Sequence, residues 1–161
     1  MIRAAIIVLA SLICAAASAQ PVVPDAAITP GALNPAVTQA TIGETICQFG
    51  WTRSVRPSYA ATHEIKRRLL TEMHRQGYAV GMQDVELDHL VPLALGGAPD
   101  AIENLWLEPR AGTEWNATRK DDLEAVLPRL VCTGRISLSE AQRAIADDWT
   151  VAWEKYIGAG Q

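Results

Sequence analysis

The sequence predicts an α+β fold in which a β-hairpin and the helix after it lie inside a single, mainly helical domain. The chain has 161 residues, which is enough for one compact domain and not comfortably for two. Two short strand-like runs, residues 85–91 and 104–108, flank a loop that contains Gly96 and Gly97. Apolar residues recur at helical spacing in three longer segments. Apolar residues make up 49% of the chain, which is typical of a protein with an ordinary packed core.

The N-terminus predicts an exported protein. Residues 1–19 have the form of a signal peptide, with Arg3, an apolar run over residues 4–17 and the small residues Ala17 and Ala19 at the cleavage site. The apolar run is short for a membrane span, which needs about 20 residues. We therefore expect a periplasmic or secreted protein with no stable membrane association after signal removal.

A proline-rich leader is expected between the signal peptide and the domain. Residues 20–40 contain four prolines among small residues, which predicts an extended or disordered segment and not a folded unit. The folded domain is expected to cover residues 41–158. Its three helical segments and its hairpin follow in order.

Two cysteines remain once Cys14 leaves with the signal peptide. In an exported chain, Cys47 and Cys132 are expected to form a disulfide that encloses the central part of the domain. The alternative is a pair of unpaired buried thiols. The chain contains no Cys-x-x-Cys sequence, which excludes a structural zinc ribbon.

The first helix is predicted over residues 58–76. Ser58 can cap it and Gly77 can end it, while Ile65, Leu69 and Met73 form one apolar stripe. The same helix carries a local excess of positive charge in a chain of net charge −4, and basic residues also precede it. These residues predict either a nucleic-acid-facing surface or an ordinary solvated face. The basic residues are Arg53, Arg56, Lys66, Arg67, Arg68 and Arg75.

The second helix is predicted over residues 114–127, with Pro128 expected to kink or end it. Its apolar residues fall within one arc of about 120°. Asn116 and Arg119 fall in the same arc, and Lys120 lies at its edge. Polar groups on an inward face need partners, because each unsatisfied group costs about 1–3 kcal/mol. A functional site at the start of this helix would supply such partners, and a capping role for Asn116 is the alternative.

The last helix is predicted to begin with a capping box, Ser137-x-x-Glu140. An apolar stripe that runs from Leu138 to Tyr156 follows, and it includes Trp149 and Trp153. We interpret this stripe as core packing and assign it no chemistry.

The central stretch carries a resemblance to a known family. It reads Glu86-x-Asp88-His89, then Pro92-Leu-x-Leu-Gly-Gly, then Asn104-Leu-Trp and Trp115-Asn-Ala-x-x-Lys-Asp. This order of motifs resembles the HNH endonucleases of the ββα-metal, or His-Me finger, group. More narrowly, residues 35–156 are similar to small exported bacterial HNH-like proteins. The resemblance implies an HNH finger within the helical domain.

The resemblance also implies roles for individual residues. His89 would be the general base that activates water, and Asn104 would fix its ring through the side-chain carbonyl. Asp88 and Asn116 would hold one divalent ion, Mg²⁺ or Mn²⁺. The chain departs from the family at Lys120, because a charged lysine cannot ligate a metal. The residues expected to contact nucleic acid are Arg53, Arg56, Arg67, Arg119 and Lys120.

The function predicted from these motifs is metal-dependent hydrolysis of phosphodiester bonds in nucleic acid, with DNA as the first candidate substrate and RNA as the second. Because the net charge is −4, contact with a polyanion would have to come from a local basic patch. One alternative is a catalytically inactive HNH-fold module that binds nucleic acid or a partner. Another is a disulfide-stapled interaction protein that uses Trp51 and Trp106 as surface anchors.

Overall fold

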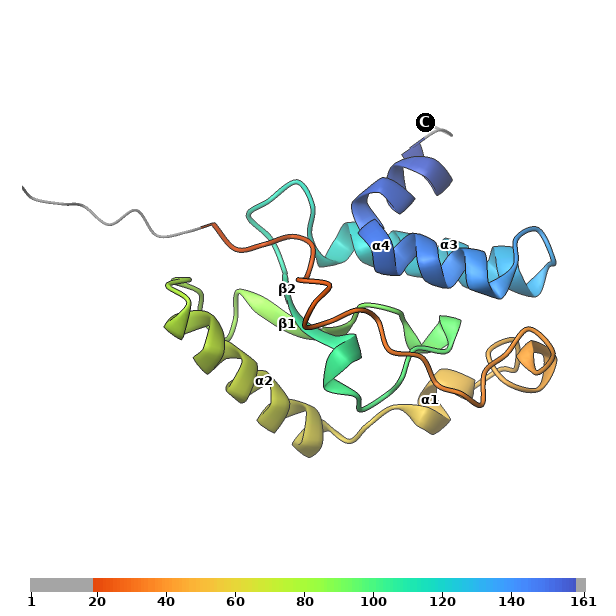
Figure 1. The fold of residues 1–161 in the computed structure, drawn as a ribbon, viewed down its shortest axis with the longest axis horizontal. Coiled ribbons are helices and arrows are strands. Elements are labelled where there is room, and N and C mark those ends of the chain that lie inside the picture. The colour runs from red at the N-terminus through yellow and green to blue at the C-terminus, as the bar shows by residue number, and fades with distance from the viewer. Residues whose placement is uncertain (1–18, 159–161) are drawn as a thin grey trace, which may run out of the picture.

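The computed structural model describes residues 19–158, so the predicted signal peptide lies almost entirely outside the described residues. It contains one antiparallel hairpin, β1 (Val85–His89) and β2 (Leu105–Pro109), followed by helix α3 (Ala117–Cys132). Helix α2 (Tyr59–Arg75) lies on one side of the hairpin, and α3 and α4 (Leu138–Tyr156) lie together on the other (Figure 1). A short helix, α1 (Trp51–Val55), precedes α2. The expected α+β class is confirmed.

The hairpin has one apolar face and one acidic face. In its register Leu87 pairs with Leu107, and Glu86 pairs with Glu108. Because side chains alternate along a strand, the leucines point one way and the glutamates the other. The apolar face packs against Leu70 of α2 to form a small core of its own, as expected from the stripe on that helix. The acidic face therefore carries charged groups into the opposite half of the molecule.

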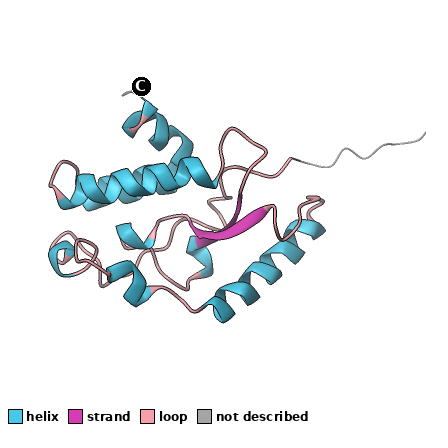
Figure 2. Cartoon of the chain, turned by 180° about the vertical axis from the view of Figure 1, so that it is seen from behind, coloured by secondary structure: helices cyan, strands magenta, loops and turns pink. Residues whose placement is uncertain are grey.

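Helices α3 and α4 pack against the main core, and each differs from its predicted form in one respect. Pro128 lies inside α3, which continues to Cys132, so the expected stop at this proline is wrong. Helix α4 is broken at Asp148, whose backbone is extended (φ −163°, ψ 103°). The Asp148 carboxylate accepts a hydrogen bond from the amide of Thr150 at 2.9 Å, so it caps the second piece of the helix. Figure 2 shows the same pair of helices from behind.

The leader, residues 20–40, is docked on the domain. Leu33 forms an isolated antiparallel bridge with Gly97, and Val37 is buried in the main core. The Trp149 indole donates a hydrogen bond to the carbonyl of Val22 at 2.7 Å. The leader thus acts as a strap across the loop of the hairpin and α4. Among the described residues, no helix is long and apolar enough to cross a membrane.

The expected disulfide between Cys47 and Cys132 is present, with the two Cα atoms 5.6 Å apart. It connects the segment before α1 to the last residue of α3, and the two cysteines are 85 positions apart in the sequence. Cross-links over long loops stabilise a fold chiefly by restricting the unfolded chain.

Reduction of this disulfide is expected to lower the free energy of unfolding by roughly 2–4 kcal/mol. Urea denaturation of the Cys47→Ser/Cys132→Ser variant, compared with the oxidised wild type, measures the difference. The same variant should show no further loss on addition of reductant, which separates the cross-link from other effects of reducing conditions. Equal stability of the oxidised and reduced wild type would contradict the expectation.

Candidate functional site

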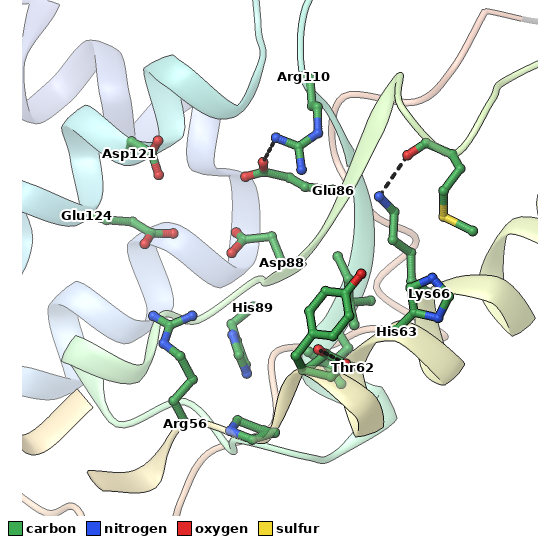
Figure 3. Close-up of a pocket in the computed structure, with 15 residues that line it drawn as sticks. Arg56, Thr62, His63, Lys66, Glu86, Asp88, His89, Arg110, Asp121 and Glu124 are labelled. Carbon is green, nitrogen blue, oxygen red and sulfur yellow. Dashed lines mark hydrogen bonds and ion pairs between the residues drawn. The ribbon is translucent and has the colours of Figure 1, made fainter. Parts of the chain in front are cut away.

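The candidate site is a cleft of about 660 Å³ that runs along β1, between α2 on one side and α3 on the other. Its two walls carry opposite charge (Figure 3). The basic and neutral polar side chains come from the α1–α2 region and the end of β2, and the carboxylates come from β1 and α3. The charged and histidine residues that line the cleft are Arg56, His63, Lys66, Glu86, Asp88, His89, Arg110, Asp121 and Glu124.

His89 ends β1 and is 7% exposed. Its Nε2 lies 2.9 Å from the carbonyl oxygen of Pro99. Burial lowers the pKa of His89, and this effect outweighs the opposing influence of the Pro99 carbonyl and of Asp88. The imidazole is therefore neutral near pH 7. Because a carbonyl only accepts hydrogen bonds, the single ring proton is on Nε2, and Nδ1 keeps its lone pair.

Asn104 supports this arrangement through the loop and does not contact the His89 ring, which corrects its expected role. The fully buried amide oxygen accepts a hydrogen bond from the amide of Val91 at 2.8 Å. The amide nitrogen donates to the carbonyls of Val91 and Ala98 at 2.9 and 3.0 Å. Asn104 thereby closes the loop beside Pro99, whose carbonyl holds His89. All the hydrogen bonds that the Asn104 side chain forms in the structure go to the backbone of Val91 and Ala98, so it acts on His89 through the loop.

Gly97 is required for the same closure. A Cβ at this position would lie 1.8 Å from the carbonyl oxygen of Val91 and 2.6 Å from the Asn104 amide nitrogen. Any side chain would therefore push apart the two segments that Asn104 joins. Gly97 thus serves the close approach of the loop to Val91 and Asn104.

Lys120 lies at the centre of the inward face of α3 and not at its edge. Its side chain is fully buried, and its ammonium contacts Asp88 at 2.5 Å, the His89 carbonyl at 2.9 Å, and Glu124. Burial alone would lower the pKa of Lys120, but Asp88, Glu124 and Glu108 raise it above its ordinary value, so the group stays charged. The expectation that Lys120 contacts nucleic acid is wrong, because no surface of this side chain is accessible.

The carboxylates around Lys120 differ strongly in pKa. Burial would raise the pKa of Asp88, but the charge and hydrogen bond of Lys120 lower it below its usual value. Burial raises the pKa of Glu124 to about 7 and that of Glu108 to about 9, against the influence of Lys120. Asp88 is thus ionised at neutral pH, while Glu108 is protonated. The cluster holds more carboxyl groups than one ammonium can neutralise.

Asn116 caps α3 and is not among the residues that line the cleft. Its side-chain oxygen accepts a hydrogen bond from the amide of Thr118 at 3.1 Å, and its nitrogen donates to the carbonyl of Thr113 at 2.9 Å. The residue is the N-cap of α3, which was the alternative to a ligand role. The Asn116 oxygen expected to ligate a metal with Asp88 is thus engaged in the helix cap, and a joint metal-ligand role for the two residues stays a prediction. The carboxylate oxygens that do converge belong to Glu86, Asp88 and Glu108.

Of the arginines expected to bind nucleic acid, Arg56 lines the cleft. Arg53 and Arg67 are exposed but lie outside the cleft lining, and Arg67 pairs with Glu64. The Arg119 guanidinium lies over the rings of Trp153 and Trp115, 4.4 and 5.1 Å from their centroids, so it stabilises the contact between α3 and α4. A single basic stripe of these residues is thus not formed.

Two further expectations concern tryptophans. Trp106 is buried in the main core at 5% exposure, and Trp51 is partly buried against it. Neither indole forms the exposed anchor that an interaction protein of the expected kind requires.

No known protein family, curated protein or solved structure shows a match to this chain.

The raised pKa of Glu108 predicts a pH dependence of stability. Between its ordinary value of 4.5 and about 9, the folded protein holds a proton that the unfolded chain releases. The free energy of unfolding from this group therefore decreases as pH rises through that window. Urea denaturation in EDTA is expected to show a weaker decrease between about pH 6 and pH 8.5 for Glu108→Gln, which keeps the neutral form, than for wild type.

The matched control is Glu103→Gln, because Glu103 is exposed and is not a member of the acidic cluster. This variant should keep the wild-type slope of stability against pH. An identical slope for wild type and Glu108→Gln would contradict the assignment of a buried, protonated Glu108.

Proposed function

We propose that this protein is an exported, metal-dependent endonuclease of the HNH type that hydrolyses phosphodiester bonds in nucleic acid, with His89 as general base. DNA is the first candidate substrate. The Cys47–Cys132 disulfide supports export, because such cross-links persist in oxidising compartments. The order of hairpin, loop and helix supports the HNH resemblance.

The observation that carries the proposal is the hydrogen bond between His89 Nε2 and the Pro99 carbonyl, in a ring that lines the cleft. A neutral imidazole with its proton fixed on Nε2 by the Pro99 carbonyl has a lone pair on Nδ1 that can accept a proton from water. The residue lines the cleft, beside Asp88 in sequence, and burial in the hairpin fixes its ring. This is the combination that general-base activation of a water nucleophile requires.

The charges in the cleft support dependence on a divalent cation. Glu86, Asp88, Asp121 and Glu124 would repel a phosphodiester, and Lys120 has no accessible surface with which to contact it. A divalent cation held by Asp88 and neighbouring carboxylates would supply Lewis acidity at the phosphoryl oxygens. Hard oxygen donors of this kind suit Mg²⁺ or Mn²⁺.

Arg56 supports the choice of a phosphate-containing substrate. Its exposed guanidinium lies beside His89 in the cleft (Figure 3), close enough to lower the pKa of that imidazole. An arginine next to the general base can bind a phosphate oxygen and position the scissile bond. Arg110 contributes less, because its guanidinium already pairs with Glu86 at 2.8 Å.

The proposal is tested by incubating purified protein with supercoiled plasmid and Mg²⁺ or Mn²⁺, with EDTA as control. Conversion to open-circular and linear forms that EDTA abolishes is the expected result. Linear single-stranded DNA and RNA, assayed in parallel, identify the preferred substrate. Intact plasmid under every metal condition would overturn the proposal.

A catalytically inactive binding module is the second candidate function. Two observations favour it: the Lys120 ammonium already contacts Asp88, and Asn116 is used as a helix cap. Retention of nucleic acid on the protein in a gel-shift assay, without cleavage in the plasmid assay, would select this function.

A further inference from the structure

The acidic face of the hairpin brings three carboxylates together. Glu86 and Glu108 are direct cross-strand partners, and Asp88 is two residues along β1 on the same face. Each of the three can offer one oxygen such that these oxygens lie within 4.8 Å of one another. Strand register therefore sets this cluster, and it draws on both strands of the hairpin.

The buried side chain of Glu108 is not fully hydrogen-bonded within the described part of the protein. The residue is 1% exposed, and its Oε1 has no hydrogen-bond partner among residues 19–158. A buried polar atom without a partner costs about 1–3 kcal/mol, and native structures contain few of them. An ion bound at this oxygen would remove that cost.

The other two carboxylates, Glu86 and Asp88, make the cluster accessible to a cation from solvent. The side chains of Glu86 and Asp88 are 25% and 24% exposed, and both line the cleft. Arg110 occupies one oxygen of Glu86, and Lys120 occupies one oxygen of Asp88. Two fixed cations thus neutralise part of the cluster, and Glu108 is contacted by neither.

We infer that Glu86, Asp88 and Glu108 form a binding site for one hard divalent cation of the Mg²⁺ or Mn²⁺ class, in which Glu108 is the buried ligand. The role of this site in hydrolysis rests on the proposed function, but cation binding itself does not. Burial raises the pKa of Glu108 against the influence of Lys120, so a cation that binds to this carboxylate at neutral pH would displace its proton. Oxygen-only donors select such ions over softer metals.

Binding is measured with Mn²⁺ alone, by electron paramagnetic resonance and isothermal titration calorimetry on purified, chelator-treated protein. We expect one ion per chain in wild type. Glu108→Gln has nearly the same shape as the protonated glutamate, so it should fold normally. Loss of outer ligand partners costs about 10–100-fold in metal affinity, so removal of this direct ligand should weaken Mn²⁺ binding by at least about tenfold.

Two further variants keep the test decisive. Glu86→Gln alters a partly exposed ligand and should also weaken binding, even if Glu108→Gln proves unstable. Glu103→Gln alters an exposed glutamate that is not a member of the acidic cluster, so this variant should bind Mn²⁺ as wild type does. Absence of Mn²⁺ binding by wild type at millimolar concentration, or equal affinity of wild type and Glu108→Gln, would overturn the inference.

The failure of the cation site and the failure of the proposed nuclease can be told apart. If Mn²⁺ binding depends on Glu108 but the protein cleaves no plasmid, the cation site is supported and only the proposed nuclease function is rejected. If the protein shows metal-dependent cleavage but Glu108→Gln binds Mn²⁺ as tightly as wild type does, the proposed cation site is rejected and the proposed nuclease function stands.

Discussion

Replacement of His89 by alanine is expected to lower the rate of plasmid cleavage by about 10²–10⁴-fold, the usual contribution of a general base. The reason is the loss of the only imidazole in the described cleft whose ring is buried, neutral and fixed by a carbonyl. Single-turnover cleavage at saturating Mg²⁺ measures the chemical step. Circular dichroism and thermal melting establish that the variant is folded.

The matched control is His63→Ala. His63 also lines the cleft but is exposed on α2, and Tyr59 lies beside its ring. Its removal should change the rate little. If the two variants cleave at the same rate, or if His89→Ala cleaves as wild type does, His89 is not the base and another group must activate water.

Replacement of Lys120 by methionine is expected to lower the free energy of unfolding by about 3 kcal/mol at neutral pH. Removing one partner of a buried ion pair costs about 3–5 kcal/mol, because the remaining charge is left without compensation. The lower end applies here, since Asp88 and Glu124 are each 24% exposed and can recruit water. Urea denaturation at pH 7 measures the difference.

Two comparisons test the cause of this loss. Lys155→Met removes an exposed ion pair with Glu140 and should cost much less stability than Lys120→Met does, because water screens an exposed pair. The double variant Lys120→Met/Glu124→Gln should recover part of the stability, because one uncompensated carboxylate is removed with the ammonium. A Lys120→Met variant as stable as Lys155→Met would show that the buried cluster does not depend on its ammonium.

Local sequence signals were sufficient for the order of elements. Ser58 and Ser137 cap helices as expected, β1 ends two residues before the end of its expected run, and β2 is shifted by one residue. Asp88 and His89 line a cleft together, as their adjacency suggested. These features depend on neighbours in the chain, which pattern and capping chemistry describe well.

The features that sequence reasoning missed depend on long-range contacts. Glu108 pairs with Glu86 through strand register, which the spacing of the two runs does not specify. The burial of Lys120 depends on how α3 rotates against the hairpin. The break at Asp148 was hidden, because an apolar stripe continues across it. The one available signal for the acidic face was the presence of acidic residues in both expected strands: Glu86 and Asp88 in the first, and Glu108 at the end of the second.

The strap formed by the leader has a consequence for how the chain acquires its structure. Val22 is bonded to Trp149, 127 positions later, so the earliest described part of the chain docks on one of the last helices to be synthesised. Such distant pairings form late and slowly, since the intervening polypeptide must first close a large loop. The strap therefore cannot dock on α4 until nearly the whole polypeptide has been synthesised. A chain built this way is expected to complete the docking of its leader on α4 as one of the last steps of folding.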